Sequence, residues 1–137
     1  MLPQQHRMRT KVQFSETTRS GVRQGRRNLV LYAVKKPAEP TLAGFIVSKA
    51  VGNAVKRNKT KRRLREVVAP KIKASPTGYF LVVRALPASA HASWNELATD
   101  FNTAYEAILD KLSKQSQNLL AVAESPETAR TTPREES

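Results

Sequence analysis

The sequence predicts an α+β fold, an α/β sandwich in which about three helices cover a small mixed β-sheet. Three short apolar segments have the composition of strands, and three longer segments have helix-capping residues or apolar residues at helical spacing. They follow one another in the order helix, strand, strand, helix, strand, helix. The chain has 137 residues, of which 39% are hydrophobic, so it can form one domain with a packed core.

The first predicted helix covers residues 11–20. Thr10 and Gln13 have the spacing of a capping box at its start, and Gly21 is a suitable residue to end it. Residues Phe14 and Thr18 are four positions apart, so they would share one face of this helix.

Two strands are predicted next, over residues 28–34 and 42–48, with a turn between them that contains two lysines and two prolines. The second strand is more uniformly apolar than the first, which is expected in the middle of a sheet. Alternation places Tyr32 on one face of the first strand together with two valines. Tyr32 and Phe14 are predicted to be core residues. If no helix covers that sheet face, an exposed tyrosine beside cations would instead be a stacking platform for unpaired bases.

A basic helix is predicted from about residue 53 to 68, ending before Pro70. At about 100° per residue, one narrow stripe of this helix is suited to burial: Thr60, Leu64, Val67 and Val68. Polar and basic residues occupy a broad opposing arc: Asn58, Lys61, Arg62 and Arg65.

The third strand is predicted over residues 79–85, and the last helix starts at a second capping box formed by Ser93 and Glu96. Apolar residues recur at intervals of three or four along this helix, which predicts a core-facing stripe. Its members are Trp94, Leu97, Ala98, Phe101, Ala104, Tyr105, Ile108, Leu109 and Leu112. The pattern fades after residue 115. We therefore expect a domain over residues 1–115 and a disordered polar tail over residues 116–137.

Charge is concentrated in the first half of the chain. Residues 1–66 carry a formal charge of +14 and residues 67–137 carry −1, and seven of the ten residues from Lys56 to Arg65 are lysine or arginine. Like charges at helical spacing repel each other, so this segment favours an anionic partner. Composition leaves duplex DNA, RNA and anionic lipid open. A membrane surface fits least, because the helix lacks a large apolar face that could insert.

The sequence offers little for protein-based catalysis. It has no cysteine, which excludes disulfides and thiolate metal sites, and its two histidines, His6 and His91, are far apart. The five glycines form no phosphate-binding loop, and eight of the eleven carboxylates lie after residue 95. No apolar run approaches the roughly 20 residues of a membrane span. The N-terminus, MLPQQHRMR, has no apolar signal core, so a cytoplasmic protein is expected.

The segment VSKAVGNAVKRNKTKRRLRE, residues 47–66, closely resembles the signature of the bacterial ribonuclease P protein component, a strand–loop–helix of the form VSKKxGNAVxRNRxKRxxRE. The likeness extends across roughly residues 6–113. Two positions differ from the family pattern. Lys59 stands where the signature has arginine, and Thr18 stands where a second aromatic residue often follows Phe14.

The resemblance implies an RNA-binding, non-catalytic subunit of the endoribonuclease that removes the 5′ leader from precursor tRNA. It implies that the catalytic RNA subunit carries out the reaction with Mg²⁺, for which the protein has no dedicated site. The implied partners are this RNA and the single-stranded leader, which would lie between the first helix and the sheet. The implied fold has a left-handed βαβ crossover around the signature helix, although the general rule predicts a right-handed one.

The resemblance also implies roles for residues at matching positions. The RNA-binding residues of the signature helix would be Lys56, Arg57, Asn58, Lys59, Lys61, Arg62 and Arg65, and those of the preceding loop Lys49 and Asn53. Phe14 and Tyr32 would form the leader-binding cleft. Two alternatives remain: a ribosomal or tRNA-binding protein without a processing role, which would lack the GNAVKRN stretch, and a free-standing nuclease, which would need clustered carboxylates.

Overall fold

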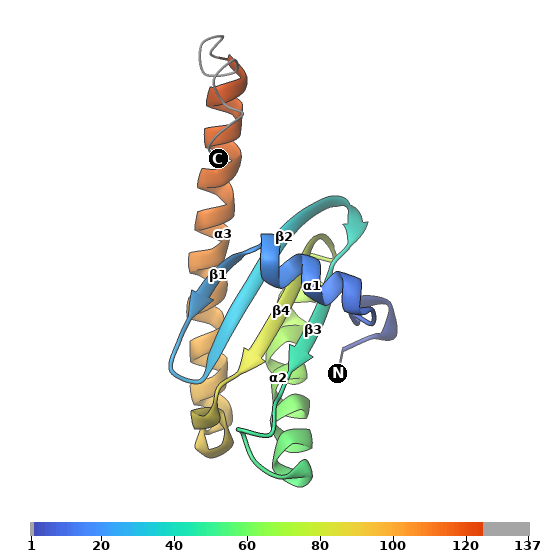
Figure 1. Ribbon diagram of the computed structural model, residues 1–137, viewed down its shortest axis with the longest axis vertical. Helices are drawn as coiled ribbons and strands as arrows, with labels where there is room; N and C mark the ends of the chain where they lie inside the picture. The colour runs from blue at the N-terminus through green and yellow to red at the C-terminus, as the bar shows by residue number, and fades with distance from the viewer. Residues whose placement is uncertain (1, 125–137) are drawn as a thin grey trace.

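A computed structural model describes residues 2–124 as a four-stranded mixed sheet with one helix on its front face and two helices on its back (Figure 1). The strand order is β1-β2-β4-β3, in which β3 and β4 are parallel and the other neighbours are antiparallel. The strands are β1 (Val22–Gly25), β2 (Leu29–Pro40), β3 (Leu42–Ile46) and β4 (Thr77–Ala85). The helices are α1 (Lys11–Ser20), α2 (Ala54–Ala74) and α3 (Trp94–Glu124), with short 3₁₀ turns η1 (Gln4–His6) and η2 (Pro87–His91). The predicted α+β sandwich is confirmed.

The crossover from β3 through α2 to β4 is left-handed. In Figure 1 both strands run downward, α2 lies behind the sheet, and β4 lies to the left of β3. With the strands turned to point upward, the chain passes behind the sheet and moves to the right, which is the left-handed sense. The expectation drawn from the family resemblance is therefore correct, against the general preference for right-handed crossovers.

The larger core lies between the back of the sheet and helices α2 and α3. Strands contribute every second residue, such as Leu29 and Leu31 of β2, and α2 contributes the whole predicted stripe from Thr60 to Val68. From α3 the buried hydrophobic residues of the described side chains are Leu97, Phe101, Ala104, Tyr105, Ile108 and Leu112. The two helical stripes predicted from periodicity are thus confirmed for the most part.

Trp94 is the exception, because its side chain is 45% exposed. The prediction that it belongs to the core is wrong. Trp94 is the first residue of α3, where the helix has only begun to approach the sheet, and the buried stripe starts one turn later at Leu97. Periodicity assigns a residue to a helix face but does not tell where along the helix the packing begins.

The predicted β-structure is wrong at one turn and lacks one strand. The predicted turn at residues 35–40 is a continuation of β2, which pairs Lys35 with Tyr79 and Lys36 with Gly78 before a register shift near the prolines. The short strand β1 was not predicted, because VRQG has little apolar character. Its backbone pairs with β2 at the outer edge of the sheet, where polar side chains are tolerated.

The prediction that residues 42–48 form a central strand is also wrong, since β3 is an edge strand. It is apolar because both of its faces are covered. Ala43 packs in the larger core, and Leu42 packs in the smaller cluster on the front of the sheet. The N-terminal segment covers the edge itself, with a bridge between Arg7 and Ala43.

Both long helices extend beyond their predicted ends. Helix α2 continues through Pro70 to Ala74, because burial of Ile72 in the larger core offsets the hydrogen bond that proline removes. Helix α3 continues to Glu124 and extends past the sheet in Figure 1. The expected boundary at residue 115 stays a prediction, and the last part of the expected tail, residues 125–137, lies outside the described residues.

Candidate nucleic-acid interface

The loop before α2 fixes where the basic helix begins. The Asn53 side chain caps the helix, its Oδ1 accepting a hydrogen bond of 3.0 Å from the Lys56 N–H. The preceding residue, Gly52, has a φ of +153°, and a Cβ there would meet the Lys56 side chain at 2.9 Å. Lys49 is exposed in the same loop. Asn53 thus lies at the start of α2 and Lys49 in the loop before it, and their RNA contacts stay predictions.

Of the predicted arc of α2, Asn58 and Arg62 are exposed, while Lys61 and Arg65 are half-buried. Of the other residues predicted to bind RNA on this helix, Lys56 and Lys59 are exposed and Arg57 is half-buried. Arg63 points elsewhere, because its Nη1 donates to the Ala92 carbonyl at 3.0 Å and ties α2 to η2. The structure therefore separates one structural arginine from the seven residues predicted to bind RNA.

Arg57 differs from its neighbours in one respect. Its Nε is buried, and no acceptor among the described residues lies within hydrogen-bonding distance. A buried donor without a partner costs about 1–3 kcal/mol.

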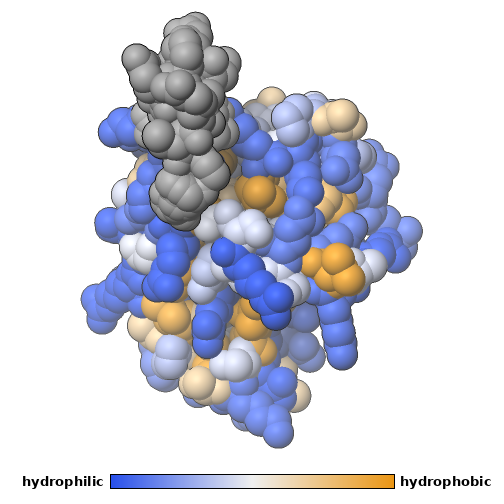
Figure 2. Space-filling view, turned by 45° about the horizontal axis from the view of Figure 1, so that its top comes forward, coloured by the Kyte–Doolittle hydropathy of each residue, from blue (hydrophilic) through white to orange (hydrophobic). Residues whose placement is uncertain are grey.

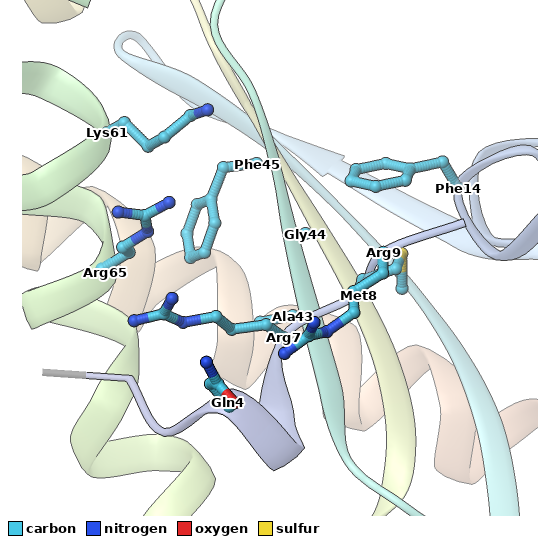
Figure 3. A pocket seen from close by; sticks show the side chains of 10 residues that line it. All are labelled: Gln4, Arg7, Met8, Arg9, Phe14, Ala43, Gly44, Phe45, Lys61 and Arg65. Atoms are coloured by element: carbon cyan, nitrogen blue, oxygen red, sulfur yellow. The ribbon is translucent and has the colours of Figure 1, made fainter. Parts of the chain in front are cut away.

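A pocket of about 310 Å³ lies where α1, β3, α2 and the N-terminal segment meet (Figure 3). Phe14 lies on one side of β3, and Phe45, Lys61 and Arg65 lie on the other, with Gly44 between them. The complete lining is Gln4, Arg7, Met8, Arg9, Phe14, Ala43, Gly44, Phe45, Lys61 and Arg65. One aromatic residue of the predicted cleft and two cations of the predicted arc are thus brought to the same place.

Tyr32 does not line this pocket. It is 9% exposed and packs with Met8, Val30, Phe80 and Val82 in a small cluster on the front of the sheet, against which Phe14 is partly buried. The alternative of an uncovered sheet face with a freely exposed tyrosine is therefore not what the structure shows. Contact of Tyr32 with a leader stays a prediction.

A polar contact holds α1 over the front of the sheet. The Lys36 ammonium on β2 donates to the Glu16 carboxylate on α1 and lies 5.4 Å from the centroid of the Phe80 ring. The hydrogen bond to Glu16 raises the pKa of Lys36 and so favours its charged form. Thr18, at the departure from the family pattern, donates to the Phe14 carbonyl at 3.0 Å.

Sequence reasoning missed Arg7 and Arg9 as site residues. The sequence offered one signal, because in HRMRT the two arginines alternate with His6 and Met8, and the structure buries His6 and Met8 but not the arginines. This two-residue period indicates an extended segment lying on the domain.

The surface shown in Figure 2 is mostly hydrophilic, and its hydrophobic residues form only small separate patches.

The fold, the basic surface of α2 and the neighbouring pocket define a small α+β protein suited to binding a nucleic-acid strand. The chain belongs to the ribonuclease P protein family, whose model, described as Ribonuclease P, matches residues 2–109. A ribonuclease P protein component from Pseudarthrobacter chlorophenolicus is 51% identical over 98% of this chain and 99% of its own. One from Kocuria rhizophila is 57% identical over 76% of this chain and 92% of its own.

Solved structures share the fold. The RNase P protein of Staphylococcus aureus superposes with a TM-score of 0.65 at 24% identity, covering 74% of this chain and 94% of that one. The RNase P protein of Thermotoga maritima gives a TM-score of 0.62 at 21% identity, and the match covers 71% of this chain and 92% of that one. Within residues 2–124, no helix has the length and apolar character needed to cross a membrane.

Proposed function

We propose that the protein is the RNA-binding subunit of ribonuclease P and assists endonucleolytic removal of the 5′ leader from precursor tRNA. The observation that carries the proposal is the surface of α2, where four exposed and three half-buried basic or amide side chains lie beside a pocket that contains Phe14. The cations of the arc would bind phosphates of the RNA subunit, and Phe14 would stack on an unpaired base of the leader.

The proposal assigns catalysis to the RNA subunit and its Mg²⁺ ions, and only binding to the protein. The roles of three carboxylates among the described residues support this division. Glu16 is paired with Lys36, Glu96 caps the start of α3 at the Ser93 N–H, and Asp100 accepts two hydrogen bonds from Asn28. Carboxylates engaged in this way stabilise the fold and are poorly placed to activate water.

The relatives bearing the name ribonuclease P protein component are bacterial, and precursor tRNA is the proposed substrate. The proposal therefore places the protein in the cytoplasm. A ribosomal or tRNA-binding protein without a processing role would share the basic surface, so processing itself has to be measured.

The test is to mix the protein with a bacterial ribonuclease P RNA and a precursor tRNA at a magnesium concentration at which the RNA alone is slow. Enhanced cleavage at the 5′ end of the mature sequence is expected. The comparison variant has Arg62 and Arg65 both changed to alanine. It should enhance cleavage less than the unchanged protein, because both arginines are predicted to bind RNA and neither is fully buried. Binding of RNA without any enhancement would contradict the proposal and favour the alternative.

A further inference from the structure

The N-terminal segment, residues 2–9, is fixed to the domain at several points. Leu2 is fully buried in the larger core, and the His6 Nδ1 lies 2.7 Å from the Thr41 carbonyl oxygen. The Met8 N–H donates to the Ala43 carbonyl at 2.9 Å, and the Met8 side chain is buried in the smaller cluster. The backbone on both sides of Arg7 is therefore held, so the position of this arginine is set before any ligand binds.

The Arg7 side chain is itself oriented by a hydrogen bond. Its Nε donates to the Leu2 carbonyl oxygen at 3.0 Å. A guanidinium has five N–H donors in a planar fork, so this bond fixes the plane of the group and leaves the donors of both Nη atoms for another partner. In Figure 3 the Arg7 guanidinium lies on the same side of β3 as Lys61 and Arg65.

Arg7 links two hollows in the surface. It lines the pocket that contains Phe14, and it also lines a neighbouring one of about 510 Å³ beside α2. Lys61 and Arg65 line both as well. Asn58, Arg62 and the exposed Glu66 complete the second. Lys61 and Arg65 of the basic arc and Arg7 of the N-terminal segment thus connect the two hollows.

We propose that Arg7, Lys61 and Arg65 form a binding site for one phosphodiester group of an RNA strand that passes between α2 and β3. This site rests on the proposed function and adds the N-terminal segment to the RNA-binding surface. Three cations around one hollow repel one another, and a phosphate would relieve that repulsion. The planar fork of Arg7 matches two phosphate oxygens, while Lys61 and Arg65 add charge from the opposite wall.

The decisive variant is Arg7→Met, which keeps much of the apolar stem and removes the charge. Arg27→Met is the control, because it removes the same kind of charge at an exposed arginine between β1 and β2, at the opposite edge of the sheet from β3. Arg7→Met should weaken the binding of the RNA that supplies the phosphate. It should also reduce the salt slope of log K for that binding by about 0.7–0.9, as expected for one lost phosphate contact. Arg7→Lys should keep the salt slope and recover only part of the affinity, because it lacks the fork.

Two titrations identify the source of the phosphate. If it belongs to the RNA subunit, Arg7→Met weakens binding to ribonuclease P RNA in the absence of tRNA. If it belongs to the leader, that affinity is unchanged, and the holoenzyme loses affinity for precursor tRNA but not for mature tRNA. Either result supports the site. An Arg7→Met protein that matches Arg27→Met in both titrations would overturn it.

A double variant tests whether the cations share one phosphate. The loss in Arg7→Met/Arg65→Met should be smaller than the product of the two single losses, since each single change already disrupts the same contact. Fully multiplicative losses would overturn the shared site. Circular dichroism melting of each variant verifies folding. Failure of the proposed function would appear differently, as a wild-type protein that does not enhance cleavage at all.

Discussion

The ring of Phe14 lies directly against the Cα of Gly44: a Cβ added at Gly44 would fall 2.5 Å from the Phe14 Cε1 and Cζ atoms. Carbon atoms in ordinary contact are about 3.5–4.0 Å apart, so no side chain fits there while Phe14 keeps its position. The absence of a side chain at Gly44, on the edge strand β3, thus allows Phe14 to take its position in the candidate interface.

Gly44→Ala should therefore displace Phe14 and loosen α1. We expect a loss of about 1–3 kcal/mol in unfolding free energy, which is typical of overpacking. We also expect weaker holoenzyme binding to precursor tRNA with little change for mature tRNA. Gly25→Ala is the control, because its nearest neighbour would be the Val30 Cγ2 at 4.0 Å. Equal behaviour of the two variants would show that Gly44 does not position Phe14.

Arg62→Ala and Phe14→Ala should weaken RNA binding by the holoenzyme in different ways. Arg62 is exposed on the arc, so its loss should reduce the salt slope of binding by about 0.7–0.9 and affect precursor and mature tRNA alike. Phe14→Ala removes a stacking surface worth about 1–3 kcal/mol per base and should affect precursor tRNA only. Titrations of both holoenzymes with both RNAs at several salt concentrations test this difference. A Phe14→Ala variant that binds both RNAs more weakly by the same factor would argue against a leader contact.

Tyr32→Ala is a less direct probe than Phe14→Ala. Because Tyr32 packs in the smaller cluster, its truncation should cost about 3 kcal/mol or more of stability. Binding data on this variant are therefore interpretable only below its melting transition.

Purified protein freed of RNA should not cleave precursor tRNA. Within residues 2–124 there is no group of three or more His, Cys, Asp or Glu side chains that could hold a metal ion. The expected result is no 5′ product with added Mg²⁺ after treatment with a nuclease that removes contaminating RNA. Cleavage that persists after this treatment and disappears on mutation of the protein's own carboxylates would contradict the prediction.

Asp100→Ala should destabilise the fold by about 1–3 kcal/mol, because it leaves two buried donors of Asn28 without an acceptor. The Asn28 N–H and Nδ2 donate to the Asp100 Oδ2 at 3.0 and 2.9 Å, which ties the start of β2 to α3. Asp110→Ala is the control, since its pair with Lys114 is exposed and worth at most about 0.5 kcal/mol. Urea unfolding of both variants measures the difference, and similar midpoints would contradict the assigned role of Asp100.

Deletion of residues 116–137 should leave the melting temperature within a few degrees of the full chain. Leu112 is the last residue of the buried stripe, and Ser113, Lys114 and Gln115 are exposed. Thermal unfolding of the two chains side by side gives the answer. A larger drop would mean that this segment contributes to the packed domain.

The sequence by itself determined the class of fold, most of the buried helical stripes and the basic arc of α2. These features depend on local periodicity and capping, which follow from residues a few positions apart, such as Thr10 with Gln13 or Leu64 with Val68. The signature from residue 47 to 66 also led to the family, which the comparisons established.

The tertiary structure decided what depends on contacts between distant segments. Strand β1 exists because β2 supplies its hydrogen bonds, and α2 continues past Pro70 because Ile72 finds a place in the core. Backbone pairing and burial depend on the partner and are therefore not encoded in the segment alone. The same holds for the site: only the path of the N-terminal segment along β3 brings Arg7 to Lys61, which is distant in sequence, because tertiary contacts fix the backbone around this arginine.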